Sequence, residues 1–283
     1  MYLTVLHRTR YLYRLPVSES YNEVRLRPAT EDPKRVTSFI LRVHPPRRLR
    51  HFRDEYFNYV QWVEIPEPHH ELMIEASTRI HTTSQYADGA SPLGITFDDI
   101  FASEQIDELR PFLGSSRYVR FDPALWRLAI DIRDERKDVF ETASAIMTYI
   151  NQNWTYQPNS TTASTHMDEV MRDRRGVCQD FAHVMLGLCR ALGIPARYVS
   201  GYIYNGPTGH MRGAQASHAW CEIALPNRGW FGLDPTNNTL TDERYIKIAT
   251  GRDYDDAAPI RGSFSGAPGA TTALEVTVEV EKI

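Results

Sequence analysis

Alternating apolar and polar positions dominate the first third of the chain. Short runs rich in β-branched and aromatic residues are separated by turn-forming clusters, a pattern typical of successive strands. These runs lie at 2–6, 38–43, 59–65 and 71–76. They predict a sandwich-like β domain over residues 1–120. The stretch from 83 to about 121 is rich in Gly, Pro, Ser and Asp and is expected to be loop or linker.

A helical period replaces this alternation in the next part of the chain. Helices are expected from Asp122, which suits an N-cap, and over 139–154 and 167–174. The strongest helix is predicted from about 177 to 192, where apolar residues recur at steps of three and one and form a single buried stripe. Gly193 supplies its C-terminal stop.

Strands are expected to return after this helix, at 196–204, 217–225 and 230–234. The segment 251–272 is rich in Gly, Ala, Ser, Pro and Asp and reads as an irregular loop. The final residues alternate cleanly, so we expect a strand at 273–282 that rejoins the β domain. The pattern as a whole predicts an α+β protein with a β domain followed by a mixed domain over 121–272.

Composition narrows the range of partners. An apolar fraction of 42% and a charged fraction of 24% are those of a globular protein with a normal core. The formal net charge of -4 gives no reason to expect nucleic acid or an anionic membrane as partner. The sequence has neither an apolar run of membrane-spanning length nor a signal-peptide core, so we expect a cytoplasmic protein. Three cysteines without such a signal argue against a disulfide framework.

One cysteine stands where a helix is expected to begin. Cys178 is predicted at the N-terminus of the strongest helix, where unpaired N–H groups and the helix dipole favour thiolate over thiol. A lone cysteine is more often a small core residue, and that interpretation suits Cys189, which continues the apolar stripe.

An imidazole and a carboxylate follow on the two predicted strands that come next. A thiol, His218 and Asp234 are the three groups that nucleophilic catalysis requires: the imidazole takes the thiol proton and the carboxylate orients the ring. His183 and His210 remain alternative bases, although His183 is expected on another face of the helix. A zinc site that uses His218, Cys221 and Cys178 is disfavoured, because residues 218 and 221 face opposite sides of a strand.

The register of these two strands decides whether such a triad can form. A two-residue turn at 227–228 would place Asp234 opposite Cys221, on the wrong face. A loop of three or five residues, or a β-bulge, would place Asp234 opposite Trp220, on the same face as His218 and diagonal to it. We therefore predict an odd-length loop or a bulge, and a hydrogen bond between Asp234 and one ring nitrogen of His218, with the other nitrogen facing the Cys178 sulfur.

Five segments of the chain resemble, in the same order, motifs of the transglutaminase-like superfamily. They are Gly176–Ala182, Arg190–Arg197, Ser217–Trp220, Leu233–Thr236 and Gly251–Asp256. The N-terminal β region resembles the accessory domain of bacterial members. The resemblance implies a papain-like core, a catalytic helix packed on an antiparallel sheet, with Cys178 as nucleophile, His218 as base and Asp234 as orienting acid. Members cross-link glutamine to amines, hydrolyse peptide or amide bonds, or have lost activity.

The expected function is that of a thiol enzyme acting on peptide or amide bonds, with a slight preference for hydrolysis. Protein-glutamine transglutaminase activity and a non-catalytic peptide-binding module are the alternatives. The expected partner is a peptide or protein substrate, and no cofactor or metal is implied. Tyr156 is the candidate for a second oxyanion donor beside the Cys178 N–H. A loop at 205–216, just before His218, is expected to be a mobile rim.

Overall fold

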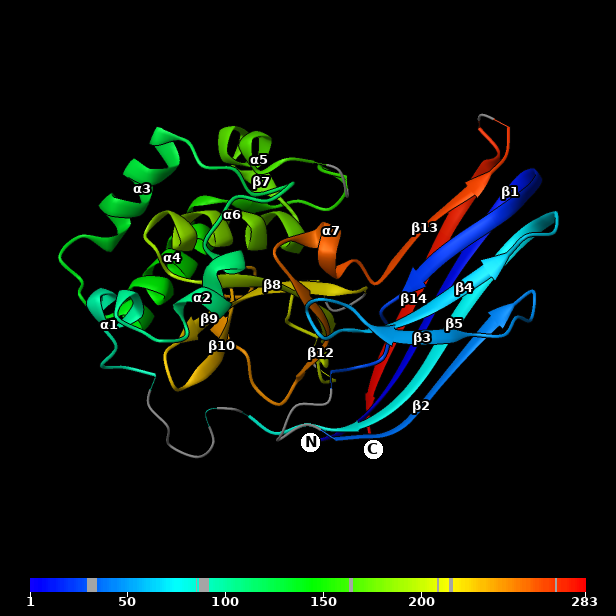
Figure 1. Ribbon diagram of the computed structural model, residues 1–283, viewed down its shortest axis with the longest axis horizontal. Helices are drawn as coiled ribbons and strands as arrows, with labels where there is room; N and C mark the ends of the chain where they lie inside the picture. The colour runs from blue at the N-terminus through cyan, green and yellow to red at the C-terminus, as the bar shows by residue number, and fades with distance from the viewer. Residues whose placement is uncertain are drawn as a thin grey trace.

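The computed structural model describes residues 1–29, 35–84, 86, 92–162, 165–207, 209–213, 216–267 and 269–283. A strand-rich part and a part that mixes helices with an antiparallel sheet lie side by side (Figure 1). The arrangement confirms the predicted α+β class.

One long strand organises the strand-rich part. Its sheet contains β1 (Tyr2–Val24), β2 (Arg35–His44), β3 (Arg50–Arg53), β4 (Tyr59–Ile65), β5 (His69–His81), β13 (Ile260–Ser265) and β14 (Thr271–Lys282). The first half of β1 pairs antiparallel with β5 and β14, and its second half pairs with β4 and β13. Both β13 and β14 therefore follow the mixed part in the chain and complete this sheet, which we call the β domain.

The mixed part, called the catalytic domain below, is built on a five-stranded antiparallel sheet in the order β11-β10-β9-β8-β12. Its strands are β8 (Ala196–Ile203), β9 (His218–Leu225), β10 (Gly229–Asp234), β11 (Thr239–Leu240) and β12 (Tyr245–Gly251). Its longer helices are α3 (Pro123–Arg133), α4 (Val139–Asn153), α5 (Met167–Asp173) and α6 (Cys178–Ala191). A short parallel pair, β6 (Thr155–Tyr156) and β7 (Arg175–Gly176), lies just before α6.

Helix α6 is the buried centre of the catalytic domain. Its apolar side chains share one core cluster with residues from α3, α4, α5 and strands β8 to β10. The helix begins at Cys178 because the Asp180 carboxylate accepts the Val177 N–H at 2.7 Å, which satisfies one orphan donor of the first turn. It ends before Gly193, whose φ of +79° is the left-handed conformation that stops helices.

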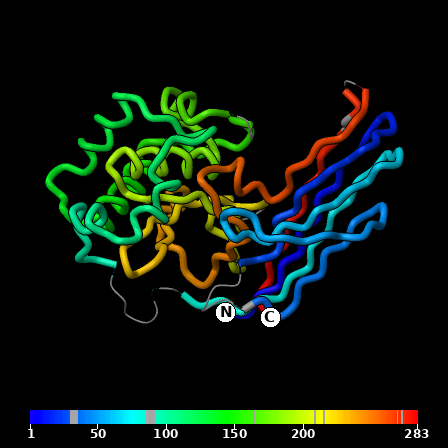
Figure 2. Tube along the Cα trace, in the orientation of Figure 1, coloured from blue at the N-terminus to red at the C-terminus, as the bar shows by residue number. Residues whose placement is uncertain are grey.

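The β domain packs against strands β8 and β12 of the catalytic sheet. Tyr202, Ile246 and Ile248, from β8 and β12, belong to the core cluster of the β domain. A hydrogen bond of 2.8 Å joins the Tyr202 hydroxyl to Nδ1 of His7 on β1. Figure 2 shows the two parts in contact along this boundary. Strands β8 and β12 thus contribute side chains to the cores of both domains.

Two segments predicted as loop contain regular structure. Within 83–121 the chain forms α1 (Phe97–Phe101), α2 (Ile106–Leu109) and the 3₁₀ helix η1 (Arg110–Phe112). Phe97 and Ile100 pack into the catalytic core, so these residues do not belong to the β domain to which they were assigned. The helices are too short to display a period, and α1 depends on a Thr96–Asp99 capping box.

The segment 251–272 contains α7 (Tyr254–Ala257) and β13, where we expected an irregular loop. Five of the six β13 residues are exposed, so the strand shows no apolar alternation that sequence reasoning could detect. Strand β12 was also missed, and β1 is far longer than the run predicted at 2–6. The C-terminal strand does lie in the β domain, paired with residues 3–13 of β1.

Candidate active site

Cys178 is the first residue of α6 and lies at the rim of the catalytic core. Its side chain is buried except for 9% of the residue surface. The preceding Val177 is extended, so Cys178 belongs to the first helical turn, whose N–H groups have no partner within the helix. Gly176 is required here, because a Cβ at this position would come within 2.6 Å of an Asp180 carboxylate oxygen. The loop before α6 is therefore closely packed on the Asp180 side chain.

His218 and Asp234 meet at one end of the catalytic sheet. His218 is the first residue of β9 and Asp234 the last residue of β10. Nε2 of His218 donates to Oδ2 of Asp234 at 2.9 Å, and both side chains are essentially inaccessible.

The register between β9 and β10 permits this contact. Leu225 pairs with Gly229, so three residues, 226–228, form the connecting loop. Leu233 pairs with Cys221, which places Asp234 level with Trp220 and diagonal to His218. The prediction of an odd-length loop is confirmed. Asn227 adopts a φ of +58° within this loop, a conformation that Asn tolerates better than most residues.

Asp234 accepts hydrogen bonds from four groups besides the imidazole. Oδ2 also accepts the Tyr245 hydroxyl and the Asn237 side-chain amide, each at 2.8 Å. Oδ1 accepts the backbone N–H of Thr236 at 2.9 Å and that of Asn237 at 3.3 Å. A carboxylate with this many donors is held in one rotamer and in its charged form.

The electrostatics of the pair favour a protonated imidazole. Burial alone would lower the pKa of His218, but the negative charges of Asp234 and Cys178 outweigh it and raise the pKa to about 10. Burial alone would likewise raise the pKa of Asp234, yet His218 and the hydrogen bonds lower it below its usual value. The ring is therefore poised to carry a proton beside a carboxylate that stays ionised.

The second ring nitrogen of His218 is buried. Nδ1 has no hydrogen-bond partner at normal distance among the described residues, whereas the Cys178 thiol is near enough to act on the charge of the ring. Gly213 also lies here, since a Cβ on it would come within 2.5 Å of Nδ1. Because Nε2 is taken by Asp234, we infer that Nδ1 is the nitrogen available to the thiol.

Tyr156 lies in the same neighbourhood. It stands on β6, level with Gly176 of β7, two residues before Cys178 in the chain. Burial and then the charge of Cys178 raise the pKa of its half-buried phenol. The Arg212 guanidinium lies 5.9 Å from the centre of its ring. The structure thus brings Tyr156 close to the thiol, while its role as an oxyanion donor stays a prediction.

The alternative bases lie elsewhere. His183 is 1% exposed, stacks on Tyr118 at 5.4 Å, and its Nε2 accepts the backbone N–H of Tyr254 at 3.2 Å. Burial lowers its pKa to about 3, so the ring stays neutral and packs as part of the core. His210 is exposed on the loop before β9.

The remaining cysteines turn away from His218. Cys221 is buried on the α6 side of β9, where it interacts with Cys189. Among the described residues, no cluster of three or more His, Cys, Asp or Glu side chains has the geometry of a metal site. No helix among them has the length and apolar character to cross a bilayer.

The loop before β9 is tied to the site by Asn237. The Asn237 side chain accepts the Arg212 N–H at 2.8 Å and donates to the Arg212 carbonyl at 3.2 Å, while also donating to Asp234. Asn205 also holds the loop, because its side chain donates to the Met211 carbonyl and accepts the Met211 N–H. Residues 208, 214 and 215 lie outside the described part of the chain, and the mobility of this rim stays a prediction.

Sequence reasoning missed Asn237 and Tyr245. A turn after Asp234 was detectable, because an Asp side chain often accepts the backbone N–H two residues further on, but nothing in the sequence pointed to the Asn237 side chain. Tyr245 carried no signal, since only the tertiary fold brings β12 within reach of Asp234.

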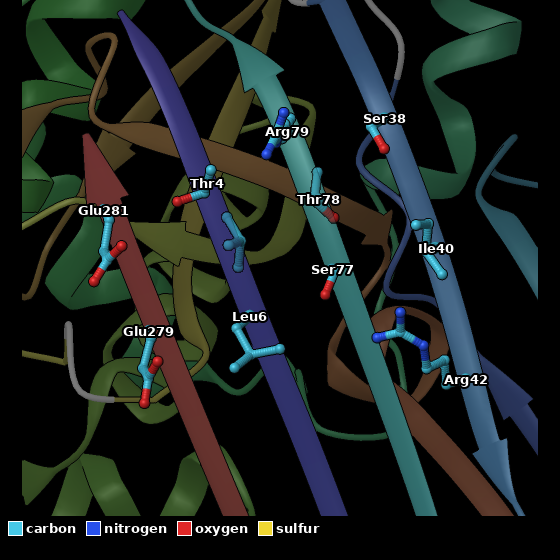
Figure 3. Close-up of a pocket in the computed structure, with 11 residues that line it drawn as sticks. Thr4, Leu6, Ser38, Ile40, Arg42, Ser77, Thr78, Arg79, Glu279 and Glu281 are labelled. Carbon is cyan, nitrogen blue, oxygen red and sulfur yellow. The ribbon is translucent and has the colours of Figure 1, made fainter. Parts of the chain in front are cut away.

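A hollow of about 440 Å³ lies on the β domain (Figure 3). Thr4, Leu6, Arg79 and Glu281 are among the residues that line it. Thr4 and Leu6 alternate along β1 with His7, whose side chain faces the catalytic domain. The hollow therefore opens on the outer face of the sheet, away from Cys178.

Two family models match the chain. The transglutaminase-like superfamily matches residues 127–235, and the bacterial transglutaminase-like N-terminal region matches residues 3–81. A protein of Mycobacterium leprae is 32% identical over 290 residues, which cover 99% of each chain. A protein-glutamine gamma-glutamyltransferase of Pseudomonas aeruginosa is 31% identical over 122 residues, covering 41% of this chain and 18% of that protein.

A solved structure has the same fold over the full length of the chain. The structure of a candidate cysteine protease from Cytophaga hutchinsonii matches with a TM-score of 0.75 and 23% identity, covering 100% of this chain and 91% of its own. The chain therefore belongs to the transglutaminase-like superfamily and carries the bacterial N-terminal region ahead of the core.

Proposed function

We propose that this protein is a cysteine-dependent enzyme that cleaves peptide or amide bonds through a thioester on Cys178. The observation that carries the proposal is the buried His218–Asp234 hydrogen bond of 2.9 Å, together with a thiol at a helix N-terminus that lies near enough to act on the charge of the imidazole. Cysteine-based acyl transfer uses these three groups: a thiol as nucleophile, an imidazole that takes its proton, and a carboxylate that orients the imidazole.

The reaction would run in two halves. The Cys178 sulfur gives its proton to Nδ1 of His218 and attacks the amide carbonyl carbon, forming a C–S bond. The C–N bond then breaks, and the amine leaves with the proton held by the imidazole. In the second half, water attacks the thioester carbon and loses a proton to Nδ1, the C–S bond breaks, and a carboxylic acid and the thiol are restored. No electrons are exchanged with an outside group.

Two donors would stabilise the oxyanion in both halves. The backbone N–H of Cys178 would be one donor, because the first N–H groups of a helix have no partner within the helix. The Tyr156 hydroxyl is the proposed second donor, because Tyr156 lies close enough to feel the charge of Cys178. Loss of one such donor typically costs about 10²–10³ in kcat.

An amine in place of water would make the same site a transglutaminase. The identity of 31% to the Pseudomonas aeruginosa protein-glutamine gamma-glutamyltransferase, over an aligned 41% of this chain, supports this second candidate. Both reactions share the thioester. We favour hydrolysis because water is always present and the triad requires no further residue to use it. The cytoplasmic location and the peptide or protein substrate also stay predictions.

The decisive experiment traps the thioester and then identifies the acceptor. The wild type and two variants, Cys178→Ala and Cys189→Ala, are mixed with a library of blocked peptides and analysed by intact-protein mass spectrometry. We expect an acyl adduct on Cys178 in the wild type and in Cys189→Ala, with none in Cys178→Ala.

Cys189 is the matched control, because it is fully buried on the same helix. Cys189→Ala is expected to destabilise the fold by about 1–2 kcal/mol through loss of a small buried group, while turnover is retained. Incorporation of ¹⁸O from labelled water into product carboxylates would establish hydrolysis, and incorporation of a primary amine would establish transfer. Equal loss of turnover in both variants would overturn the assignment of Cys178.

A further inference from the structure

The inner face of β14 carries an apolar row that continues beyond the core. Leu274, Val276, Val278 and Val280 alternate on one side of the strand. Val278 and Val280 are packed in the core of the β domain. Leu274 and Val276 follow on the same side but remain 56% and 45% exposed. Two aliphatic side chains on the inner face of a sheet are thus left without a covering layer.

A cavity of about 150 Å³ lies against these two side chains, between the two domains. The β domain contributes Tyr11, Leu274 and Val276 to its wall, and the catalytic domain contributes Tyr254 and Ser217. None of the described residues that line it is an Asp, Glu, Lys or Arg. The one histidine that lines it, His7, is buried, and burial lowers its pKa to about 4, so the wall carries no charge at neutral pH.

The cavity borders the candidate active site. Ser217 immediately precedes His218 in the chain, and His218 pairs with Gly201 of β8. The next residue of β8 is Tyr202, whose hydroxyl contacts His7 in the cavity wall. On the other side, the rings of Tyr254 and Tyr198 lie 6.3 Å apart, and Tyr198 is near enough to Cys178 for the thiolate charge to raise the pKa of its phenol after burial. Ser217 thus joins the cavity wall to His218, and Tyr198 lies between Tyr254 of the wall and Cys178.

We propose that this cavity is a specificity subsite that receives an apolar side chain, of the Leu or Phe class, of the polypeptide cleaved at Cys178. This proposal rests on the proposed function. The volume is below the range of about 300–1,000 Å³ that holds a whole small-molecule ligand, which suits one side chain of an extended chain. The β domain would then contribute directly to substrate choice as well as supporting the catalytic sheet.

The subsite can be tested with reagents that alkylate Cys178. The probes are acetyl-Ala-Ala-Ala-Gly chloromethyl ketones in which each alanine in turn is replaced by Leu or Glu, and iodoacetamide serves as a reagent too small to reach the subsite. In each case the thiolate sulfur bonds to the methylene carbon and the halide leaves. Second-order rate constants are measured by intact-protein mass spectrometry at neutral pH.

At one position of the peptide, the Leu reagent should react at least about tenfold faster than the Glu reagent, the discrimination that an apolar pocket gives. Leu274→Glu and Val276→Glu should each reduce this ratio by about fivefold or more, because a carboxylate would line the cavity. Thr277→Glu is the matched control, since Thr277 is exposed on the opposite face of the same strand and pairs with Arg8. It should leave the ratio unchanged, and circular dichroism verifies that each variant is folded.

The possible outcomes distinguish failure of the proposed subsite from failure of the proposed function. Fast iodoacetamide labelling of Cys178 with no Leu preference at any position would overturn the subsite and leave the proposed function standing. A Leu preference that persists in both Glu variants would also overturn it. Slow labelling of Cys178, at the rate of Cys189, would instead contradict the proposed function itself.

Discussion

Removal of the Tyr245 hydroxyl tests how the buried carboxylate controls the imidazole. Tyr245→Phe keeps the ring, which is fully buried and packs 5.3 Å from Trp220, and deletes only the O–H that donates to Oδ2 of Asp234. The carboxylate retains its other donors, including Nε2 of His218. With less competition for its charge, Asp234 should attract the imidazolium more strongly.

The size of the effect follows from the strength of the lost bond. A hydrogen bond to a charged group contributes about 1.5–3 kcal/mol, and the lower end applies here because four donors remain. The free energy of unfolding should therefore fall by about 1.5 kcal/mol. If all of this free energy appeared in the protonation of His218, the pKa of the ring would rise by about one unit. Because part of the loss falls on other groups, we expect the pKa of His218 to rise by about half a unit to one unit.

The pKa is measured by NMR titration of the His218 ring protons, and turnover is followed from pH 6 to 11. Tyr202→Phe is the matched control, since the buried Tyr202 hydroxyl bonds to His7 and makes no contact with Asp234. It should cost comparable stability without moving the His218 titration. An unchanged His218 titration in Tyr245→Phe, with Tyr202→Phe behaving in the same way, would refute the view that the donors to Asp234 set the charge of the ring.

Two further predictions concern the rim loop and acid stability. Gly213→Ala should lower turnover by about tenfold, because residue 213 has a φ of +79° and the new methyl group would lie within 2.5 Å of Nδ1 of His218. Gly206→Ala is the control and should leave turnover unchanged, because residue 206 has a similar φ of +64° but no neighbour within 4 Å of the added methyl group. Burial lowers the pKa of His183 to about 3 from 6.5, so stability present above pH 6.5 should be lost as the pH falls toward 3. His183→Gln, which keeps an acceptor for the Tyr254 N–H, should flatten that slope in thermal unfolding; an unchanged slope would contradict the neutral role of His183.

The candidate triad was predictable because each member leaves a local signal. The helix that carries Cys178 shows a strong period and a clear stop, and both strands that follow it are bounded by turn residues. Parity of the connecting loop then restricts the register to those that allow contact between His218 and Asp234. Local pattern and loop length together specify this geometry without knowledge of the rest of the fold.

The remainder depends on contacts that no local pattern encodes. Tyr245 reaches Asp234 only because β12 lies beside β8. Strand β13 is exposed over most of its length and is held by its pairing with β1, so its side chains show no alternation. The helices at 97–112 are too short to show a period and are stabilised by packing on the catalytic core. In each case tertiary contacts determine whether the element or contact forms, and the local sequence gives only a weak signal for it.

The two strands that return to β1 have a consequence for biosynthesis. Because β13 and β14 follow the catalytic domain in the chain but pair with β1, the first sheet to begin is the last to be completed. While the ribosome makes the intervening segment, β1 lacks partners on one side, and such open edges invite association with other chains. Its long-range pairing also implies a high contact order and slow folding. The catalytic domain can gather around α6 during this interval, so the nascent β domain, rather than the enzyme core, is the part of the molecule that would gain most from a chaperone.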